Sequence, residues 1–316
     1  MTPLLRSLRA KFLVLIILSS LLLLAACGST PNTSPGASGN PNSQITLTVG
    51  GKLDVEAQLL TKMYTLLLRH AGFTVNEKPA LGTNDVVLNA INSGAIDLYP
   101  EFTATGLARL GLQTAHDPQK DYQAVKQGYE SKYKITWLDV APLNDTYGLC
   151  APKAAATTLN LTKLSDLTPA AASQMTIASP TDGQDPLKAM ESVYGVHFKK
   201  VIVLDEALTF QTVTQAQAQL NVCYTTSALI NQSNFVLLND DKNAFPIYNP
   251  APIVRDSTLQ KAPAIATTLN PLAPKLTTDV SIQLQTLVTT AVKNGTPKSQ
   301  AITKTATDWL KSQGLL

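Results

Sequence analysis

The stretch that decides the fold is ITLTVGGKLDVEAQLLTKMYTLLLRHAGFTV, residues 45–75. Residues 45–49 alternate apolar and polar side chains and stop at two glycines, which predicts a strand followed by a turn. Within residues 55–70 the apolar side chains recur at helical spacing, and Gly72 stands where a left-handed residue would end the helix. Residues 73–75 predict the next strand.

The same alternation continues along the chain and predicts an α/β fold. Residues 85–92 are helical in period and end at Gly94, and residues 95–99 predict a strand that runs into a proline. Later segments predict strands at 146–150, 175–178, 201–203 and 222–224, a helix start at 161–167, and helices at 186–194, 207–220, 257–269, 277–293 and 298–313. Strands that alternate with helices favour a mainly parallel sheet covered on both faces.

Two sets of strands and helices predict two lobes with a cleft between them. The chain leaves the first set near residue 150 and returns near residue 250, so two crossovers should join the lobes. The expected limits are 45–149 with 251–316 for the first lobe and 150–250 for the second. That length suits two domains of ordinary size.

Residues 1–26 have the pattern of an export signal. Three basic residues precede an apolar run at 12–24, and Leu24-Ala25-Ala26-Cys27 has the form of a lipobox. The run is shorter than the about 20 residues of a spanning helix and ends at a cleavage signal. We expect Cys27 to become the lipidated first residue of a protein that works outside the cytoplasm; an uncleaved anchor is the alternative.

The composition after the signal is neutral. Residues 28–43 are almost entirely Gly, Ser, Thr, Pro, Asn and Ala, which predicts a flexible linker over 27–44. The formal charge of +3 is carried by the three basic residues of the signal. The remaining chain has no basic cluster, and this argues against nucleic acid as a partner, because such binding neutralises many phosphates.

Motifs of common catalytic and metal sites are absent. The chain has no G-x-S-x-G, H-E-x-x-H or G-x-x-x-x-G-K motif, and its three histidines lack metal-ligand spacing. We expect no catalytic centre, metal or cofactor. An exported hydrolase or transferase that uses carboxylates such as Glu101 is a remote alternative.

Two cysteines remain besides Cys27. Cys150 and Cys223 could form a disulfide in an oxidising compartment, but sequence cannot show that their Cα atoms come within bonding range. Two separately buried thiols are equally compatible with the sequence.

Four tyrosines stand at predicted strand ends and crossovers. Tyr99 and Tyr224 end strands, and Tyr147 and Tyr248 stand at the two crossovers. Ligands of open α/β sheets bind beside the carboxyl ends of strands, so these rings are expected to face the cleft. The alternative is that they are core or interface tyrosines with satisfied hydroxyls.

Five spaced motifs resemble one protein family. They are GGK at 50–52, DLYPEFTAT at 97–105, LNDTY at 143–147, CYTT at 223–226 and DDKNAFPIYNPAP at 240–252. In this order they are similar to motifs of the glycine betaine, carnitine and choline-binding lipoproteins of osmoprotectant ABC importers. The resemblance runs from residue 45 to the C-terminus.

The resemblance implies a bilobal periplasmic-binding-protein fold of type II in which aromatic rings surround a quaternary ammonium. A trimethylammonium group has no N–H to donate, whereas ring faces attract it by about 0.5–2 kcal/mol each. It also implies delivery of the solute to an ABC permease driven by an ATPase. A monomer held to the membrane by its lipid is the simplest expectation.

Position by position, the resemblance assigns the cage to Tyr147, Tyr224 and Tyr248. Phe102 falls where the family usually has tyrosine. Thr105 falls at a threonine that is expected to contact the polar end of the ligand.

Other positions bear on the ligand's identity. Tyr122 is a further candidate ring. Lys52 stands at the carboxyl end of the first predicted strand, where its charge would repel choline and could pair with a carboxylate, so we hypothesise a zwitterionic ligand such as a betaine. Departures from the family pattern at 54–57, 104 and 226–228 leave an amino acid or another polar solute as the alternative.

Overall fold

The computed structural model describes residues 40–181 and 184–316, and Pro41–Leu316 form one compact unit. A short 3-10 helix, η1 (Pro41–Gln44), precedes the first strand. The predicted signal, Cys27 and most of the predicted linker lie outside the described residues.

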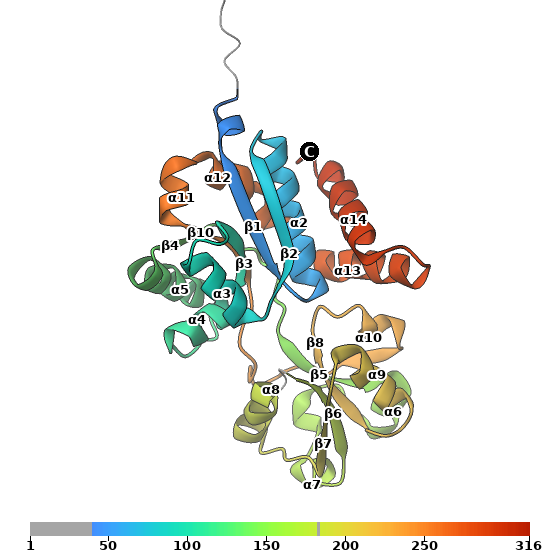
Figure 1. Cartoon of the computed structure of the whole chain (residues 1–316). Coiled ribbons are helices and arrows are strands. Elements are labelled where there is room, and N and C mark those ends of the chain that lie inside the picture. Colours follow the sequence, from blue (N-terminus) through green and yellow to red (C-terminus); the bar gives the residue numbers. More distant parts are fainter. Residues whose placement is uncertain (1–39, 182–183) are drawn as a thin grey trace, which may run out of the picture. The chain divides into compact units, whose positions relative to one another are not determined.

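The first sheet has the strand order β2-β1-β3-β10-β4 (Figure 1). Its strands are β1 (Thr46–Lys52), β2 (Thr74–Gly82), β3 (Leu98–Phe102), β4 (Ile135–Trp137) and β10 (Pro250–Arg255). β1 runs parallel to β2 and β3, whereas β10 runs antiparallel between β3 and β4.

Helices pack on both faces of this sheet and form two cores. The helical elements are α2 (Val55–His70), α3 (Asn84–Asn92), α4 (Thr103–Leu110), α5 (Pro118–Tyr133), α11 (Asp256–Lys261), α12 (Ala264–Leu269), η4 (Asn270–Lys275), α13 (Thr278–Lys293) and α14 (Lys298–Ser312). Leu98 of β3 belongs to the core of α2, α12, α13 and α14, and the next residue, Tyr99, belongs to the core of α3, α4 and α5. Successive strand residues point to opposite faces, so one strand serves both cores.

The second sheet has the order β7-β6-β8-β5-β9. Its strands are β5 (Tyr147–Pro152), β6 (Thr176–Pro180), β7 (Lys200–Leu204), β8 (Leu220–Tyr224) and β9 (Phe235–Leu237). β6 is parallel to β7 and β8, and β5 is antiparallel to β8 and β9. The helical elements are α6 (Lys153–Leu159), η2 (Leu164–Asp166), α7 (Pro169–Ala172), α8 (Gln184–Ala189), the π-helical η3 (Met190–Tyr194), α9 (Glu206–Thr214) and α10 (Leu229–Gln232).

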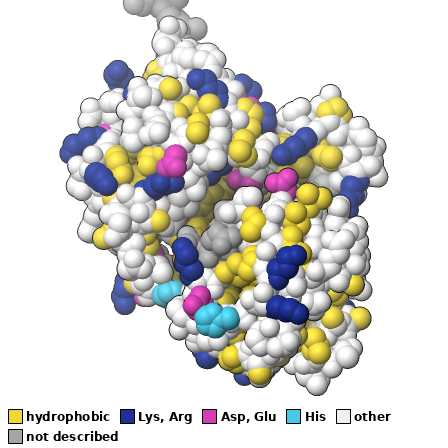
Figure 2. Space-filling view, turned by 60° about the horizontal axis from the view of Figure 1, so that its bottom comes forward, with side chains coloured by type: hydrophobic (Ala, Val, Ile, Leu, Met, Phe, Trp, Pro, Cys, Tyr) yellow, Lys and Arg dark blue, Asp and Glu magenta, His cyan; other side chains and the backbone are white. Residues whose placement is uncertain are grey.

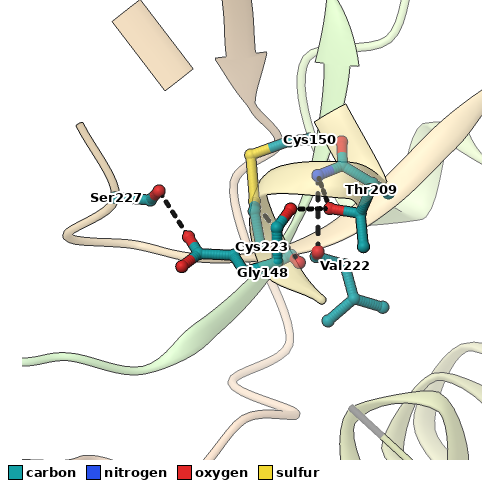
Figure 3. Close-up of a disulfide and its surroundings, with 8 residues drawn as sticks. Gly148, Cys150, Thr209, Val222, Cys223 and Ser227 are labelled. Atoms are coloured by element: carbon teal, nitrogen blue, oxygen red, sulfur yellow. Dashed lines mark hydrogen bonds between the residues drawn. A yellow bond between two sulfur atoms is a disulfide. The ribbon is translucent and has the colours of Figure 1, made fainter. Parts of the chain in front are cut away.

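A disulfide joins the two central strands of the second sheet. Cys150 of β5 and Cys223 of β8 are fully buried, with Cα atoms 5.9 Å apart (Figure 3). They lie on the face covered by Phe210 and Val213 of α9, whereas Leu149 and Val222 face the opposite core. The pairing that the sequence left open is therefore present.

Coverage of both sheet faces is confirmed, but the prediction of mainly parallel sheets is wrong. Each sheet has two parallel and two antiparallel neighbour pairs. The antiparallel strand of the first sheet, β10, follows the second crossover and lies between β3 and β4, which come earlier in the chain. That of the second sheet, β5, follows the first crossover and lies between β8 and β9, which come later. Apolar periodicity reports burial and not strand direction, so the sequence could not reveal this.

Several predicted boundaries are also wrong. The strand expected at 95–99 is β3, which begins at Leu98 and continues through Pro100. The helix expected at 207–220 ends at Thr214, because Ala216 has a positive φ of 58° and the chain then enters β8. The helix expected at 257–269 is divided by Pro263 into α11 and α12, and the helix start at 161–167 is the short η2.

The two glycines after the first predicted strand lie inside β1 and do not form a turn. A Cβ atom at Gly51 would stand 2.3 Å from Thr61 Oγ1 and 2.7 Å from the carbonyl oxygen of Pro79. Gly51 is therefore required by the close approach of α2 and β2 to the end of β1. This approach fixes the position of Lys52.

Candidate functional site

Two crossover segments connect the sheets, and hydrogen bonds hold them side by side. Residues 138–146 lead to β5, and residues 238–249 lead to β10. The Asp145 amide donates to the Tyr248 carbonyl (3.0 Å), and the Tyr248 amide donates to Asn144 Oδ1 (2.8 Å). Thr146 Oγ1 donates to the Pro246 carbonyl (2.5 Å). Two of the five motifs thus fix the crossovers to each other, while the lobe limits of 45–149 with 251–316 and 150–250 stay a prediction.

The three tyrosines predicted for the cage come together at these crossovers. Tyr147 begins β5 and pairs with Tyr224 at the end of β8, and Tyr248 lies on the return crossover. The ring centroids of Tyr147 and Tyr224 are 5.3 Å apart with planes at 36°, and those of Tyr147 and Tyr248 are 5.7 Å apart at 86°. All three residues are half-buried, so part of each side chain stays exposed to solvent.

Thr225 holds the tyrosine cluster in place. Its amide donates to the Thr146 carbonyl (2.8 Å), its hydroxyl accepts from the Thr146 amide (3.1 Å), and its hydroxyl donates to the Asn144 carbonyl (3.0 Å). The residues next to Tyr147 and Tyr224 are therefore locked together. The CYTT motif contained this residue, but only the topology shows that it contacts the first crossover.

A buried ion pair lies at the ends of β1 and β3. Lys52 Nζ is 2.5 Å from Glu101 Oε1 and 5.0 Å from the centroid of the Phe102 ring. Glu101 also accepts from the Phe102 amide and from the Tyr99 hydroxyl, both at 2.8 Å. Burial, followed by the charge of Glu101, raises the pKa of Tyr99. Several hydrogen bonds thus compensate the burial of this carboxylate.

This ion pair changes how Lys52 acts at the site. From the sequence alone Lys52 is an isolated charge, but in the structure Glu101, which is 1 % exposed, pairs with it and offsets part of that charge. Tyr99, expected at the cleft, is fully buried in the core of α3, α4 and α5, because its side chain points to the face opposite Leu98. For Tyr99 the core alternative holds.

Thr105 and Tyr122 occupy different surroundings. Thr105 lies in the first turn of α4 and is half-buried. Tyr122 of α5 is buried in the core of α3, α4 and α5, and its hydroxyl donates to the Leu138 carbonyl (2.9 Å). Burial, followed by the charge of Asp139, raises the pKa of Tyr122. Their roles in ligand binding stay predictions.

Potential metal-ligating side chains do not cluster in the described residues. Between 40 and 181 and between 184 and 316, no group of three or more His, Cys, Asp or Glu side chains gathers as a metal site would require. In the same part of the chain, no helix combines the length and apolar character needed to cross a membrane. On the face drawn in Figure 2, Lys and Arg side chains are dispersed over the surface and do not form one patch.

Solved structures share this fold. The apo form of YehZ from Escherichia coli superposes with a TM-score of 0.67 at 28 % identity, covering 86 % of this chain and 99 % of that one. A glycine betaine/carnitine/choline ABC transporter protein superposes with a TM-score of 0.71 at 22 % identity, covering 85 % of this chain and 99 % of the other. The predicted bilobal α/β periplasmic-binding-protein fold of type II is therefore confirmed.

Sequence relatives point the same way. The carnitine transport binding protein OpuCC of Listeria monocytogenes is 29 % identical over 283 residues, which are 86 % of this chain and 89 % of that protein. The glycine betaine-binding protein YehZ of Escherichia coli K12 is 30 % identical over 281 residues, 84 % and 90 % of the two chains. The family described as the substrate binding domain of ABC-type glycine betaine transport systems matches residues 45–312. A match of this extent means that the chain belongs to that family of extracytoplasmic substrate-binding proteins.

Proposed function

We propose that this protein captures a quaternary ammonium solute in a cage of Tyr147, Tyr224 and Tyr248 and delivers it to an ABC permease. The observation that carries the proposal is the meeting of three half-buried rings at the two crossovers. Relatives named for glycine betaine and carnitine support the same ligand class. Phe102, Thr105 and Tyr122 are proposed to complete the site.

The energetics of such a cage are sufficient for solute capture. Each cation–π contact contributes about 0.5–2 kcal/mol, the upper value applying when the cation is desolvated. Three rings, together with burial of the methyl groups, can reach micromolar affinity, about −8 kcal/mol net of the cost of association. Binding of this strength does not require a formal negative charge in the cage.

Titration calorimetry of the purified protein with glycine betaine, carnitine, choline and proline tests the proposal. Micromolar binding of at least one quaternary amine, with proline silent, is the expected result. Silence across the three amines from a folded sample, or tighter binding of proline, would remove the ligand class and shift the search to amino acids and other polar solutes.

We also propose that the ligand is a zwitterion whose carboxylate binds Lys52. The ammonium of Lys52 has three donors, of which one serves Glu101. A charge-assisted hydrogen bond contributes about 1.5–3 kcal/mol, so Lys52→Met combined with Glu101→Gln should weaken glycine betaine binding by about tenfold or more. Choline affinity should stay within about twofold, since choline offers no carboxylate.

The double substitution leaves no buried charge without its partner, which a single change would do. Lys62→Met with Glu77→Gln is a matched control, because that ion pair is also largely buried, with its N···O distance at 2.6 Å, and joins α2 to β2. Calorimetry with both ligands decides the matter. If the Lys52/Glu101 variant loses the same affinity for both, Lys52 does not discriminate between them.

Lipidation of Cys27 is proposed from the export signal and lipobox of the sequence. Metabolic labelling with radioactive palmitate should label the wild type in the membrane fraction, and Cys27→Ala should lose the label. A variant with Cys150→Ala and Cys223→Ala should keep it. Equal labelling of Cys27→Ala and wild type would contradict the proposal.

A further inference from the structure

One buried carboxyl group is not explained by the cage. Glu56, in the first turn of α2, is 4 % exposed. Its Oε2 atom accepts from Ser281 Oγ and from Gln285 Nε2 (3.1 Å), both on α13. Its Oε1 atom is buried and has no hydrogen-bond partner. Ionisation of this carboxyl group would cost free energy, because burial removes water from Oε1 and no hydrogen bond from the protein takes the place of that water.

The same group stands where the two lobes touch. Gln285 Nε2 also donates to the Thr226 carbonyl (3.1 Å), on the loop that follows β8 of the second sheet. Thr226 Oγ1 donates to Asp145 Oδ1 (2.6 Å) on the first crossover. One set of hydrogen bonds therefore runs from α2 and α13 to the loop that follows Tyr224 and to the crossover that precedes Tyr147.

A second contact joins α13 to a helix of the second lobe. Gln232 Nε2 of α10 donates to Thr289 Oγ1 (2.7 Å), and Lys293 Nζ donates to Gln232 Oε1 (2.5 Å). Both partners of Gln232 are on α13. Glu56 thus contacts α13, the same helix that contacts the loop after β8 and α10.

The charges that face Glu56 are of its own sign. They are Asp145, on the crossover, and Asp54, the residue that caps α2; Ser281 and Gln285 of α13 and Thr226 after β8 are uncharged. Burial, followed by the charge of Asp145, raises the pKa of Glu56 well above its usual range, against a smaller lowering by Ser281 and Thr226. In its neutral form the group gains an O–H donor, and Thr226 is the side chain beside it that can accept.

We propose that Glu56 is a positioning residue that carries a proton while the two lobes are in contact, and that loss of this proton separates the Thr226 loop from α2 and α13. Ionised Glu56 would face the carboxylate of Asp145 across Thr226, and because Glu56 and Thr226 are buried, like charges repel strongly there. The effect on ligand capture rests on the proposed function. The protonation of Glu56 and the contact of the Thr226 loop with α2 and α13 do not depend on it.

The sign of the pH dependence follows from linkage. A carboxyl group with a raised pKa in the folded protein binds its proton more tightly there than in the unfolded chain. Its contribution to stability is complete below the unfolded pKa and is lost as the pH rises through the folded pKa. The contact between the lobes, and with it solute affinity, should therefore weaken toward alkaline pH.

Two measurements on the full chain without ligand test the proton itself. Infrared spectra recorded as the pH rises should show a carboxylic-acid C=O band that persists after the exposed carboxyl groups have ionised, is absent in Glu56→Gln and is retained in Asp279→Asn, a change at an exposed acid of α13. The free energy of unfolding of wild type, relative to that of Glu56→Gln, should fall as the pH rises. The slope of this difference against pH should be no steeper than the release of one proton gives. A wild-type spectrum without the band, or a difference in unfolding free energy that does not change with pH, would overturn the proposal.

A third measurement connects the proton to solute binding. Wild-type affinity for the quaternary amine should fall by up to about tenfold per pH unit above the raised pKa, because binding of the one proton that the contact needs becomes tenfold less favourable with each such unit. Glu56→Gln keeps the shape of the neutral acid, so it should bind as well as wild type below the raised pKa and show a flat profile. Identical profiles would refute the coupling, whereas an infrared band with no binding of any amine would instead refute the proposed ligand.

Discussion

Tyr147→Ala should weaken binding of the quaternary amine by about 30-fold or more. Tyr147 is the ring that contacts both Tyr224 and Tyr248, so its removal deletes one cation–π face and also the aromatic pairs that orient the other two. A desolvated cation–π contact contributes about 2 kcal/mol, and an aromatic pair about 0.5–1.5 kcal/mol. Because about 1.4 kcal/mol corresponds to tenfold in affinity, a loss of about 2 kcal/mol or more gives this change.

Two matched substitutions separate a ring effect from a folding effect. Tyr147→Phe keeps the ring face and should bind within about threefold of wild type. Tyr133→Ala removes a tyrosine whose ring packs 5.0 Å from that of Tyr129 in α5, outside the cluster, and should leave affinity unchanged. Calorimetry on folded samples decides the matter, and a Tyr147→Ala protein that binds as tightly as wild type would mean that the cluster is not the cage.

Replacement of both Cys150 and Cys223 by alanine should lower the free energy of unfolding by about 2–4 kcal/mol. The disulfide closes a loop between residues 73 positions apart, and a cross-link over a long loop restricts the unfolded chain most. It also joins β5 to β8, the two strands whose ends carry Tyr147 and Tyr224. Urea denaturation followed by circular dichroism measures the change.

The disulfide prediction has an internal control in the wild type. Reduction of the native protein before denaturation should produce a loss similar to that of the double variant, because both remove the same cross-link. Solute affinity well below the denaturation midpoint should change little, since the β5–β8 pairing remains. A difference of less than about 0.5 kcal/mol between oxidised and reduced protein would contradict a stabilising role.

Long amphipathic helices were predictable from the sequence. The prediction at 55–70 coincides with α2, and those at 277–293 and 298–313 differ from α13 and α14 by one residue at an end. Each of these helices buries one stripe against the sheet, so its apolar period is strong. Short elements such as α6, α7 and α10 carry too few residues for a period to appear.

Strand pairing could not be predicted from the sequence, for a physical reason. Pro100 was interpreted as the end of a strand, because proline lacks an amide donor. In the structure it lies within β3 and is opposite Pro252 of β10. Two prolines can face each other in an antiparallel pair at a position where neither needs to donate. A partner 152 positions later in the chain leaves no signal near Pro100.

The candidate site was predictable where topology alone places a residue. Tyr147, Tyr224 and Tyr248 stand at strand ends or crossovers, and any fold with this connectivity brings such positions together. The pairing of Lys52 with Glu101 was not predictable, because it depends on which face each side chain takes on β1 and β3. The same applies to Glu56, whose partners on α13 lie more than 200 positions away.

The most direct measurement of the cage is an intermolecular NOE experiment on the saturated complex. With glycine betaine bound to protein in which only tyrosine rings are protonated, the N-methyl protons should show NOEs to the rings of Tyr147, Tyr224 and Tyr248. Assignment rests on loss of each signal in the corresponding Tyr→Phe or Tyr→Ala variant. A saturated complex whose N-methyl protons show no NOE to any of these three rings would contradict capture of the ammonium between them.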